Sequence, residues 1–454
     1  MNEFLHALSE LIWGWPLLSS IFLVGIYFSF KLKIPTWGTL KLSMKYITGD
    51  AIANDRCSGN VSVFASLCTA LSATLGTGNI VGMAVAITIG GPGALFWLWA
   101  SSIFCLALRY AESMLAVKYR KIATDGTVSG GPMYYMDYGL GSDALAKIFA
   151  VSGVLVALVG IGTFAQSNSI AIACRTFKMP PAATTAILTI TVALVIVGGL
   201  KKIAVVAEKI VPIMTIFYIG SAAIVLLANI FRIPAALYSI FRCAFDPQSV
   251  IGGGAGISAA IAASVGVRRG IFSHEAGLGS STIAAATARV DSAPKQGIAS
   301  MIGALLSVVV CTMTGLVVLV SCDNALLFGS GALEGATLTA YAFSKGLHMA
   351  IVGEYVVSIS IVFFAFTTII GWNYYGEKCV NYIFGPRAIV PYKLLFLFFV
   401  AIGPFFRIVS IFALADIVVG IMAAVNLIGL VGLRSVIADE TKEFFKSQPF
   451  KASK

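Results

Sequence analysis

The chain has 454 residues, of which 58% are hydrophobic and 11% are charged. This composition leaves too little polar surface to cover a water-soluble domain, so it excludes a soluble protein and predicts one that is integral to a lipid bilayer. The formal net charge of +11 does not indicate a nucleic-acid partner, because the basic residues are scattered between apolar stretches. Eight cysteines without CxxC spacing and three histidines provide no zinc or redox framework.

Eleven apolar windows approach or exceed the length, about 20 residues, that crosses a bilayer. In chain order they are Ile12–Phe30, Val61–Gly90, Pro92–Val117, Leu145–Ala173, Pro181–Gly199, Ile203–Leu227, Val250–Val267, Gly297–Ser321, Ala350–Tyr374, Lys393–Phe406 and Val409–Leu433. The seventh window is weakly apolar and the tenth is short. The segment before the first window contains Glu3 and Glu10 but no lysine or arginine, so we expect a permanent helix rather than a cleaved secretory signal.

Lysines and arginines are unevenly distributed over the loops between these windows. One alternate set of loops, which includes the carboxy-terminal tail, holds 24 of them, whereas the other set holds 6. Cytoplasmic loops carry the excess of such residues. We therefore expect a multi-pass protein of the cytoplasmic (inner) membrane, with the amino terminus outside and the carboxy terminus in the cytoplasm.

The second window is interrupted at its middle by Leu75-Gly76-Thr77-Gly78-Asn79. Glycines and a polar amide weaken a helix, and lipid offers no partner for the freed backbone groups. Such an interruption is expected only where it is buried in protein or lines a polar cavity, where its carbonyls and amides can bind an ion or a small zwitterion. We predict binding here, in preference to close packing of small residues between helices.

The ten windows after the first divide into two sets of five that start on opposite sides of the membrane, which is typical of inverted-repeat transporters. The chain would then consist of an extra amino-terminal helix and linker (1–60), a first repeat (61–230), a second repeat (231–435) and a cytoplasmic tail (436–454). The second repeat should contain a matching break in the seventh window. Gly252–Gly256 are the candidates, for which binding and helix packing are equally favoured, and the break could also fall later, among Ser258 to Ser264.

Charged residues lie near and inside several of the windows. The stretch from Arg268 to Pro294, with a short helix over Ile283–Ala288, is expected to be a cytoplasmic loop of a kind that often gates. Its arginines are better explained by the positive-inside rule than by gating. Arg109 and Glu112 stand three residues apart and are expected to form a local ion pair. Asp416 lies inside the last window, and an intramembrane acid is functional by default, so it is a candidate gating residue whose partner is open.

Several long motifs resemble the alanine or glycine:cation symporter family of sodium-coupled amino-acid importers. They are Gly76-Thr77-Gly78-Asn79-Ile80-Val81-Gly82, Gly90-Gly91-Pro92-Gly93-Ala94-Leu95-Phe96-Trp97-Leu98-Trp99, Glu112, Lys118-Tyr119-Arg120, Gln166-Ser167-Asn168-Ser169, Arg269 to Gly277, Gly371 to Glu377, Asp416 and Asn426-Leu427-Ile428. His274, Asn373 and Ser281-Thr282 depart from the commonest family pattern. The resemblance implies an all-α membrane protein of the leucine-transporter type. It would have ten core helices in a 5+5 inverted repeat, discontinuous helices and one extra amino-terminal helix.

This resemblance also implies a sodium site between the first broken helix and the eighth core helix. Sodium needs about five or six oxygens, which neutral carbonyls and hydroxyls can supply. The matching groups are the backbone carbonyls of Ser72 and Leu75 with the hydroxyls of Thr367 and Thr368. The alternative is that both threonines bond the carbonyl one turn back in their own helix.

A small amino acid would present a carboxylate and an ammonium group to the same region. Backbone amides around Thr77, Gly78 and Asn79 suit the carboxylate, and the side-chain oxygens of Asn79 and Gln166 suit the ammonium. Gly254 and Gly256 would contribute from the second broken helix. Trp372 could form the floor of the pocket and limit the size of the substrate side chain. The alternative for Gln166 is an interhelical hydrogen bond. The alternative for Trp372 is an aromatic anchor at the membrane interface.

We therefore expect a sodium-coupled symporter that imports small neutral amino acids, alanine first and glycine next, in the L or D form. A membrane enzyme is disfavoured because no window holds paired acids, a histidine cluster or an activated serine. A channel usually builds its filter by symmetry from repeated loops, whereas two unlike breaks in one chain suit alternating access. Proton coupling remains an alternative to sodium.

Overall fold

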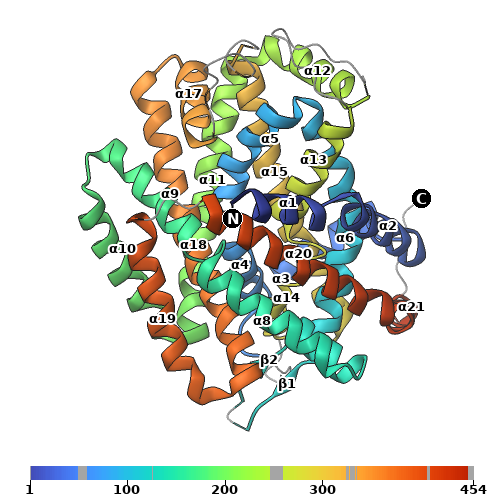
Figure 1. Cartoon of the computed structure of the whole chain (residues 1–454). Helices are drawn as coiled ribbons and strands as arrows, with labels where there is room; N and C mark the ends of the chain where they lie inside the picture. The colour runs from blue at the N-terminus through green and yellow to red at the C-terminus, as the bar shows by residue number, and fades with distance from the viewer. Residues whose placement is uncertain are drawn as a thin grey trace.

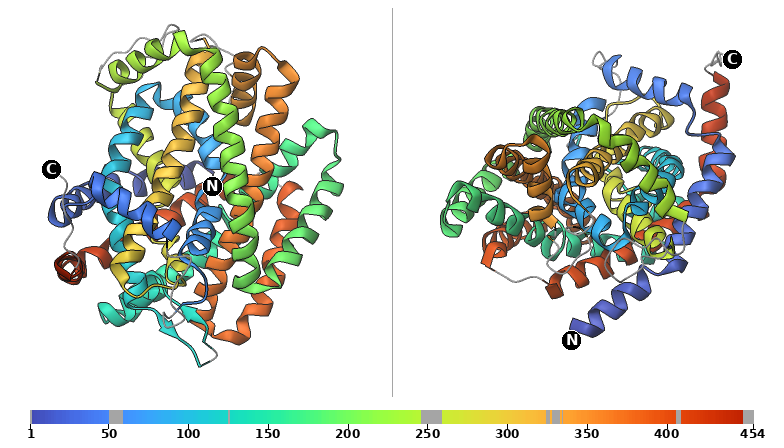
Figure 2. Two further views of the ribbon diagram at one scale, coloured as in Figure 1. Left: turned by 180° about the vertical axis from the view of Figure 1, so that it is seen from behind. Right: turned by 90° about the horizontal axis from the view of Figure 1, so that it is seen from above.

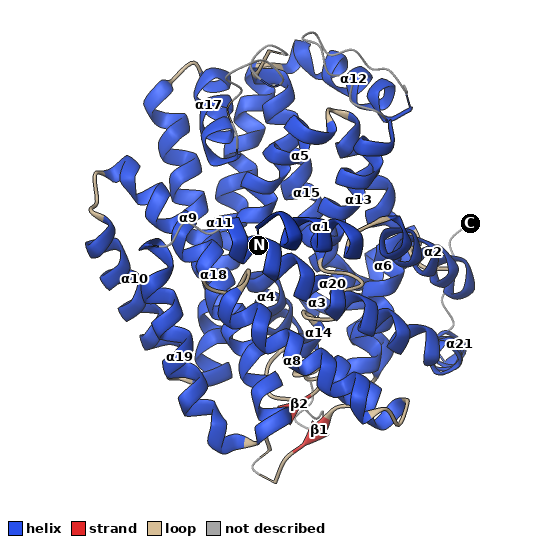
Figure 3. Cartoon of the chain, viewed as in Figure 1, coloured by secondary structure: helices blue, strands red, loops and turns tan. Residues whose placement is uncertain are grey.

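The computed structural model describes residues 2–49, 59–124, 126–245, 259–323, 335–405 and 409–447, together with Leu327 and Leu333. Nearly all of this part of the chain is helical (Figure 3). Its strands form one short antiparallel pair, β1 (Lys121–Ile122) with β2 (Val128–Ser129). The all-α class implied by the family resemblance is confirmed.

The helices of the amino-terminal half can be followed in chain order in Figure 1. They are α1 (Asn2–Ile12), α2 (Trp15–Leu32), α3 (Trp37–Gly49), α4 (Val63–Thr74), the π-helix η2 (Gly78–Gly82), α5 (Met83–Gly90), α6 (Gly93–Lys118), α7 (Pro132–Tyr134), the π-helix η3 (Tyr135–Gly139), α8 (Asp143–Val159), α9 (Phe164–Cys174), the 3-10 helix η4 (Arg175–Phe177), α10 (Pro181–Ile196) and α11 (Gly199–Ala228).

The carboxy-terminal half is built in the same way. Its helices are the 3-10 helix η5 (Ile230–Arg232), α12 (Ile233–Phe245), α13 (Ala259–His274), α14 (Thr282–Ala285), α15 (Ala293–Ser321), α17 (Gly335–Leu347), α18 (Ala350–Phe384), the 3-10 helices η6 (Pro386–Ala388) and η7 (Gly403–Phe405) on either side of α19 (Ile389–Ile402), α20 (Val409–Gly432) and α21 (Arg434–Ser447).

Eight helices of the described part are long and apolar enough to cross a membrane, and the bent pair α4 and α5 makes a ninth candidate. The buried share of each span separates a centre from a periphery. The buried share is 67% for α6 and α18, but it is 28% for the span Ala7–Leu32, which includes part of α1 and all of α2. Seen from above, α1 and α2 lie along the outside of the bundle (Figure 2), where lipid can cover their apolar side chains.

The predicted break in the second window is confirmed. Helix α4 ends at Thr74, η2 begins at Gly78, and the two parts of the span are bent by 56°. A further interruption, at residues 160–163 between α8 and α9, was not predicted from the sequence.

A second interruption of the described chain lies after α13 (Ala259–His274). Gly252–Gly256 lie outside the described residues, and the alternative is wrong over residues 259–264, because α13 runs without interruption to His274. The chain leaves the helix after His274, with positive φ at Glu275 (53°), Gly277 (93°) and Gly279 (78°), and resumes as α14. The two glycines accept this left-handed backbone without strain.

This unwound segment lies inside the protein and not in an exposed loop. The chain lies close to α6 here: a Cβ atom added to Gly270 would contact Ser101, and one added to Gly277 would lie 3.8 Å from Leu108. The chain therefore runs along the middle of α6 from Gly270 to Gly277. Residues 275–288 are all buried. The stretch predicted to be a cytoplasmic loop therefore contains a buried break in the described chain, and Arg268 and Arg269 belong to α13. Removing these two from the loop count still leaves 22 basic residues against 6.

Candidate functional site

The first break faces α18 at a pair of oxygen atoms. The Thr368 hydroxyl lies 3.4 Å from the backbone carbonyl oxygen of Leu75, the residue that caps the carboxy-terminal end of α4. It also donates to the carbonyl of Phe364, one turn back in its own helix, at 2.8 Å. Both Leu75 and Thr368 are fully buried. The structure thus brings together two of the four predicted sodium ligands.

The Thr367 hydroxyl, a third predicted ligand, points elsewhere, whereas the fourth is the backbone carbonyl of Ser72 and not its side chain. The Thr367 hydroxyl donates to the Phe364 carbonyl at 3.0 Å and lies 3.6 Å from the sulfur of Met214 in α11. The Ser72 hydroxyl donates to the Thr69 carbonyl at 2.7 Å, and it would lie 2.7 Å from a Cβ on Gly371 of α18. Ser72 therefore packs against α18 one turn from Thr368, whereas Thr367 faces α11.

Gln166 reaches the same break from α9. Its Oε1 accepts a hydrogen bond from the Thr77 hydroxyl at 3.1 Å. A Cβ on Gly76 would lie 2.8 Å from Thr368 Oγ1 and 3.6 Å from Gln166 Nε2. Helices α9 and α18 thus converge on the glycine that follows α4, and any side chain there would displace their polar groups.

Open space adjoins the break at Gly78. Gly78 is exposed although Thr77 and Asn79 on either side are buried, and no atom lies within 4 Å of the position that its Cβ would take. Backbone at this point is accessible to a small ligand, which a buried and fully packed helix would not allow.

The Asn79 side chain is turned away from this space and joins the two breaks. Its Nδ2 donates to Ser307 Oγ of α15 at 2.6 Å and to Ser273 Oγ of α13 at 3.2 Å. Its Oδ1 accepts from the Gly76 amide at 3.4 Å, and its own carbonyl accepts from Thr314 Oγ1 at 3.0 Å. Sequence reasoning missed the roles of Ser273, Ser307 and Thr314, which carry no signal beyond being polar residues in apolar helices.

Trp372 is buried, with 2% of its surface exposed, so the alternative of an interfacial anchor does not fit. Its Cβ would lie 2.9 Å from a Cβ on Gly162, in the interruption between α8 and α9. Its ring contacts Tyr375 edge to face at 5.5 Å, and its Nε1 has no hydrogen-bond partner. Gly254 and Gly256, the remaining predicted substrate residues, lie outside the described part of the chain.

A second polar cluster holds the unwound segment after α13. Glu112 Oε1 accepts from the Gly277 amide at 2.8 Å and from Asn426 Nδ2 at 2.6 Å, and Asn426 Nδ2 also donates to the Gly277 carbonyl at 2.9 Å. The Tyr135 hydroxyl donates to Asn426 Oδ1. The predicted ion pair of Glu112 with Arg109 is not formed at contact distance: Glu112 Oε2, Arg109 Nε and Arg109 Nη1 have no hydrogen-bond partner in the described structure. The two side chains still interact electrostatically.

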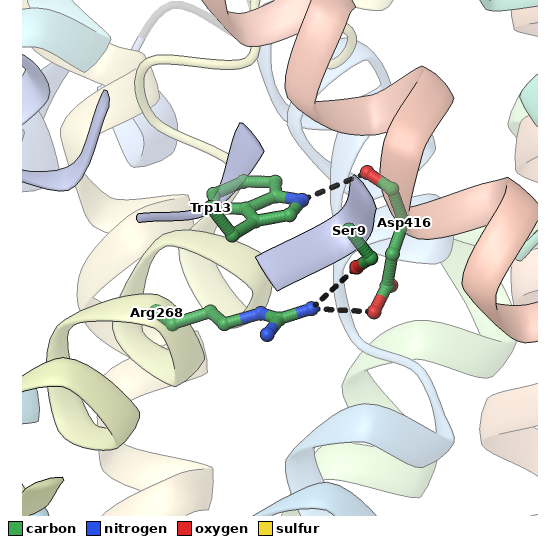
Figure 4. A network of polar contacts seen from close by, with 4 residues as sticks. All are labelled: Ser9, Trp13, Arg268 and Asp416. Atoms are coloured by element: carbon green, nitrogen blue, oxygen red, sulfur yellow. Dashed lines mark hydrogen bonds and ion pairs between the residues drawn. The ribbon is translucent and has the colours of Figure 1, made fainter. Parts of the chain in front are cut away.

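Asp416 has a partner that the sequence did not identify. Its Oδ2 lies 2.5 Å from Nη2 of Arg268 in α13, and Arg268 also contacts Ser9 Oγ at 3.4 Å (Figure 4). The Trp13 indole donates to the Asp416 backbone carbonyl at 2.8 Å. The peripheral helix α1 and Trp13, which follows it, thus cover an ion pair between α13 and α20.

Comparison with known proteins places these features in context. The chain matches the sodium:alanine symporter family over residues 1–454. It is 45% identical to an uncharacterized transporter of Haemophilus influenzae, covering 98% of this chain and 96% of the relative. It is 40% identical to the sodium/alanine symporter AgcS of Methanococcus maripaludis, covering 97% and 96%. The crystal structure of MhsT in complex with L-phenylalanine is similar in fold, with a TM-score of 0.58 at 12% identity, covering 86% of this chain and 99% of MhsT. This likeness confirms the leucine-transporter-type fold.

Proposed function

This chain belongs to the sodium:alanine symporter family, and from that premise we propose that it imports alanine, and next glycine, together with sodium by alternating access. The protein is a multi-pass membrane transporter and not an enzyme. The proposal extends to either enantiomer of alanine. It also includes two inverted repeats over 61–230 and 231–435, and a carboxy terminus in the cytoplasm.

The observation that carries the proposal is the oxygen pair at the first break. The Leu75 carbonyl and the Thr368 hydroxyl lie 3.4 Å apart, beside open space at Gly78. Two oxygens at this spacing can both lie within bonding distance of one hard cation placed between them. Sodium would bind there, with the Ser72 carbonyl and a rotated Thr367 hydroxyl completing the set.

The amino acid would bind beside the ion, in the space next to Gly78. The backbone amides at Thr77, Gly78 and Asn79 would hold its carboxylate, and Gln166 Oε1, which now accepts from Thr77, would accept from its ammonium. Asn79 would act mainly by fixing the break to α13 and α15 rather than by contacting the substrate. Gly254 and Gly256 remain candidate ligands, and Trp372 would limit the side chain.

A counterflow assay tests the substrate class. Purified protein in liposomes loaded with unlabelled amino acid and sodium should take up labelled alanine and glycine but not lysine or glutamate. Uptake of lysine or glutamate without alanine would refute the small neutral substrate. Counterflow that persists when potassium replaces all sodium would refute sodium as the coupled ion.

A further inference from the structure

The two broken spans are joined at one end of the bundle, where the chain before α4 lies beside the chain after α14. The Asn60 amide donates to the Thr287 carbonyl at 2.8 Å. The Arg289 amide donates to the Val61 carbonyl at 2.8 Å, so Val61 pairs with Ala288 as in a parallel sheet. Because these bonds join main chain to main chain, α4 and α14 are held together as one unit, which we call the inner pair.

Unwound chain separates each member of the inner pair from the outer half of its span. Helix α4 ends at Thr74, and the span bends by 56° before it continues into α5. Helix α14 follows the segment after His274, in which Gly277 and Gly279 have positive φ. Such segments absorb changes in backbone dihedral angles that a continuous helix resists. They are hinges about which the inner pair can turn while the outer halves stay in place.

The hairpin of β1 and β2 lies against the inner pair, at the lower end of the molecule in Figure 1. Arg120, directly before β1, donates from Nη1 to the carbonyls of Ala286 and Ala288 at 2.9 and 2.8 Å. Gly130, directly after β2, lets the chain approach the same segment, because a Cβ there would lie 2.6 Å from that of Ala286. Both ends of the hairpin therefore contact the chain that follows α14.

Asn60 connects the hairpin to the other member of the inner pair. Its Nδ2 donates to the Gly126 carbonyl at 2.9 Å, and its Oδ1 accepts from the Val128 amide at 2.7 Å. On the far side of the hairpin, Lys378 near the end of α18 donates to the Val128 carbonyl at 3.1 Å and to Ser129 Oγ at 2.9 Å. The hairpin thus bridges the inner pair and α18.

This bridge closes the interface in which the proposed sodium site lies. Leu75 at the end of α4 faces Thr368 of α18 at 3.4 Å. Nearer the hairpin, the Tyr375 hydroxyl of α18 donates to the Ala70 carbonyl of α4 at 3.5 Å. Alternating access requires a bound substrate to reach both sides in turn. The inner pair must then move away from α18 at the end that carries the hairpin, which is the cytoplasmic end in the proposed orientation.

We propose that the hairpin is a strap that keeps this end of the transport path closed, and that the contacts of Asn60 and Arg120 with it are released when the inner pair moves. The strap rests on the proposed function, because alternating access is what requires this end to open and close. Both residues are positioning residues: they touch neither the proposed sodium site nor the substrate space, and they set the balance between the closed and the open state.

The test measures how readily the interface of α4 with α18 is exposed. Ala70 is buried, and Ala70→Cys places a thiol beside the contact with Tyr375. Inside-out membrane vesicles are treated with a membrane-impermeant maleimide, and mass spectrometry of peptides gives the labelling rate at position 70. Asn60→Ala in this background loses two hydrogen bonds and should raise the rate about tenfold, which corresponds to about 1.4 kcal/mol. Asn60→Asp keeps only the acceptor for the Val128 amide, so its rate should lie between the two.

A second variant and a control distinguish release of the strap from general loosening. Arg120→Gln should raise the labelling rate in the same direction, so it tests the strap even if Asn60→Ala does not fold. Thr124→Ala removes an exposed hydroxyl of the same hairpin and is the matched control, for which the rate should stay at that of Ala70→Cys alone.

An unchanged rate in folded Asn60→Ala or Arg120→Gln overturns the strap. A rise of the same size in Thr124→Ala overturns it too, as does an equal rise in right-side-out vesicles. Alanine uptake by the wild type is measured in parallel. Uptake with unchanged labelling in the variants leaves the proposed function intact and refutes only the strap. A wild type without alanine uptake refutes the proposed substrate, while faster labelling in both variants still supports the strap.

Discussion

Replacing Thr368 by alanine removes one oxygen from the proposed sodium site. The hydroxyl lies 3.4 Å from the Leu75 carbonyl in a fully buried position. The loss of a contact of hydrogen-bond strength to a charged species costs about 1.5–3 kcal/mol. This corresponds to roughly ten- to hundredfold weaker sodium binding. The sodium concentration for half-maximal alanine uptake should rise by that factor, with a much smaller change in the alanine KM at saturating sodium.

Uptake of labelled alanine into liposomes, measured over a series of sodium concentrations, gives both quantities. Thr368→Ser keeps the hydroxyl and should restore most of the wild-type sodium dependence. Thr367→Ala is the second comparison, because that hydroxyl lies near Met214 in α11 and its loss should shift the sodium dependence less. An unchanged sodium dependence in folded Thr368→Ala would refute the reasoning from the oxygen pair.

Three further predictions concern the walls and supports of the site. Trp372→Ala should admit valine and leucine, measured as competition with labelled alanine, and a folded variant that still excludes both would show that Trp372 does not set the size limit. Asn426→Ala should lower the stability by about 1–3 kcal/mol, because the Gly277 carbonyl and Glu112 lose a buried donor; an unchanged thermal transition in detergent would contradict this role. Arg268→Gln and Asp416→Asn should each alter the uptake rate, and the double variant should be no worse than either single variant. Strictly additive losses would show that the two residues act separately.

The sequence predicted the first break because the conflict there is local. Glycines and an asparagine at the middle of an apolar window violate the requirements of a lipid-exposed helix, whatever the rest of the chain does. The apolar length of the other windows likewise predicts their helices, since each satisfies its own backbone.

The break after His274 is not predicted from the sequence, because its evidence is not local. Arg268, His274 and Glu275 lower the hydropathy of the chain and resemble a loop, yet Arg268 is paired with Asp416, 148 residues away. Gly277 is held by Glu112 and Asn426, which lie 165 and 149 residues from it. Hydropathy cannot register partners at such separations, so polar residues that are satisfied inside the fold were assigned to the cytoplasm.

The same limit applies to the candidate site. Leu75 and Thr368 could be paired from the sequence through the family resemblance and their similar depth. The contacts of Asn79 with Ser273 and Ser307 depend on the packing of three helices. The hydrogen-bonded pair of Arg268 with Asp416 depends on which of two adjacent arginines reaches that carboxylate, and only the folded chain decides this.

Coupled flux tests the central claim most directly. In liposomes that contain only this protein, an inward sodium gradient should drive alanine above its external concentration, and an inward alanine gradient should drive the uptake of labelled sodium. Alanine accumulation driven by a proton gradient without sodium, or alanine movement that carries no sodium, would contradict the account.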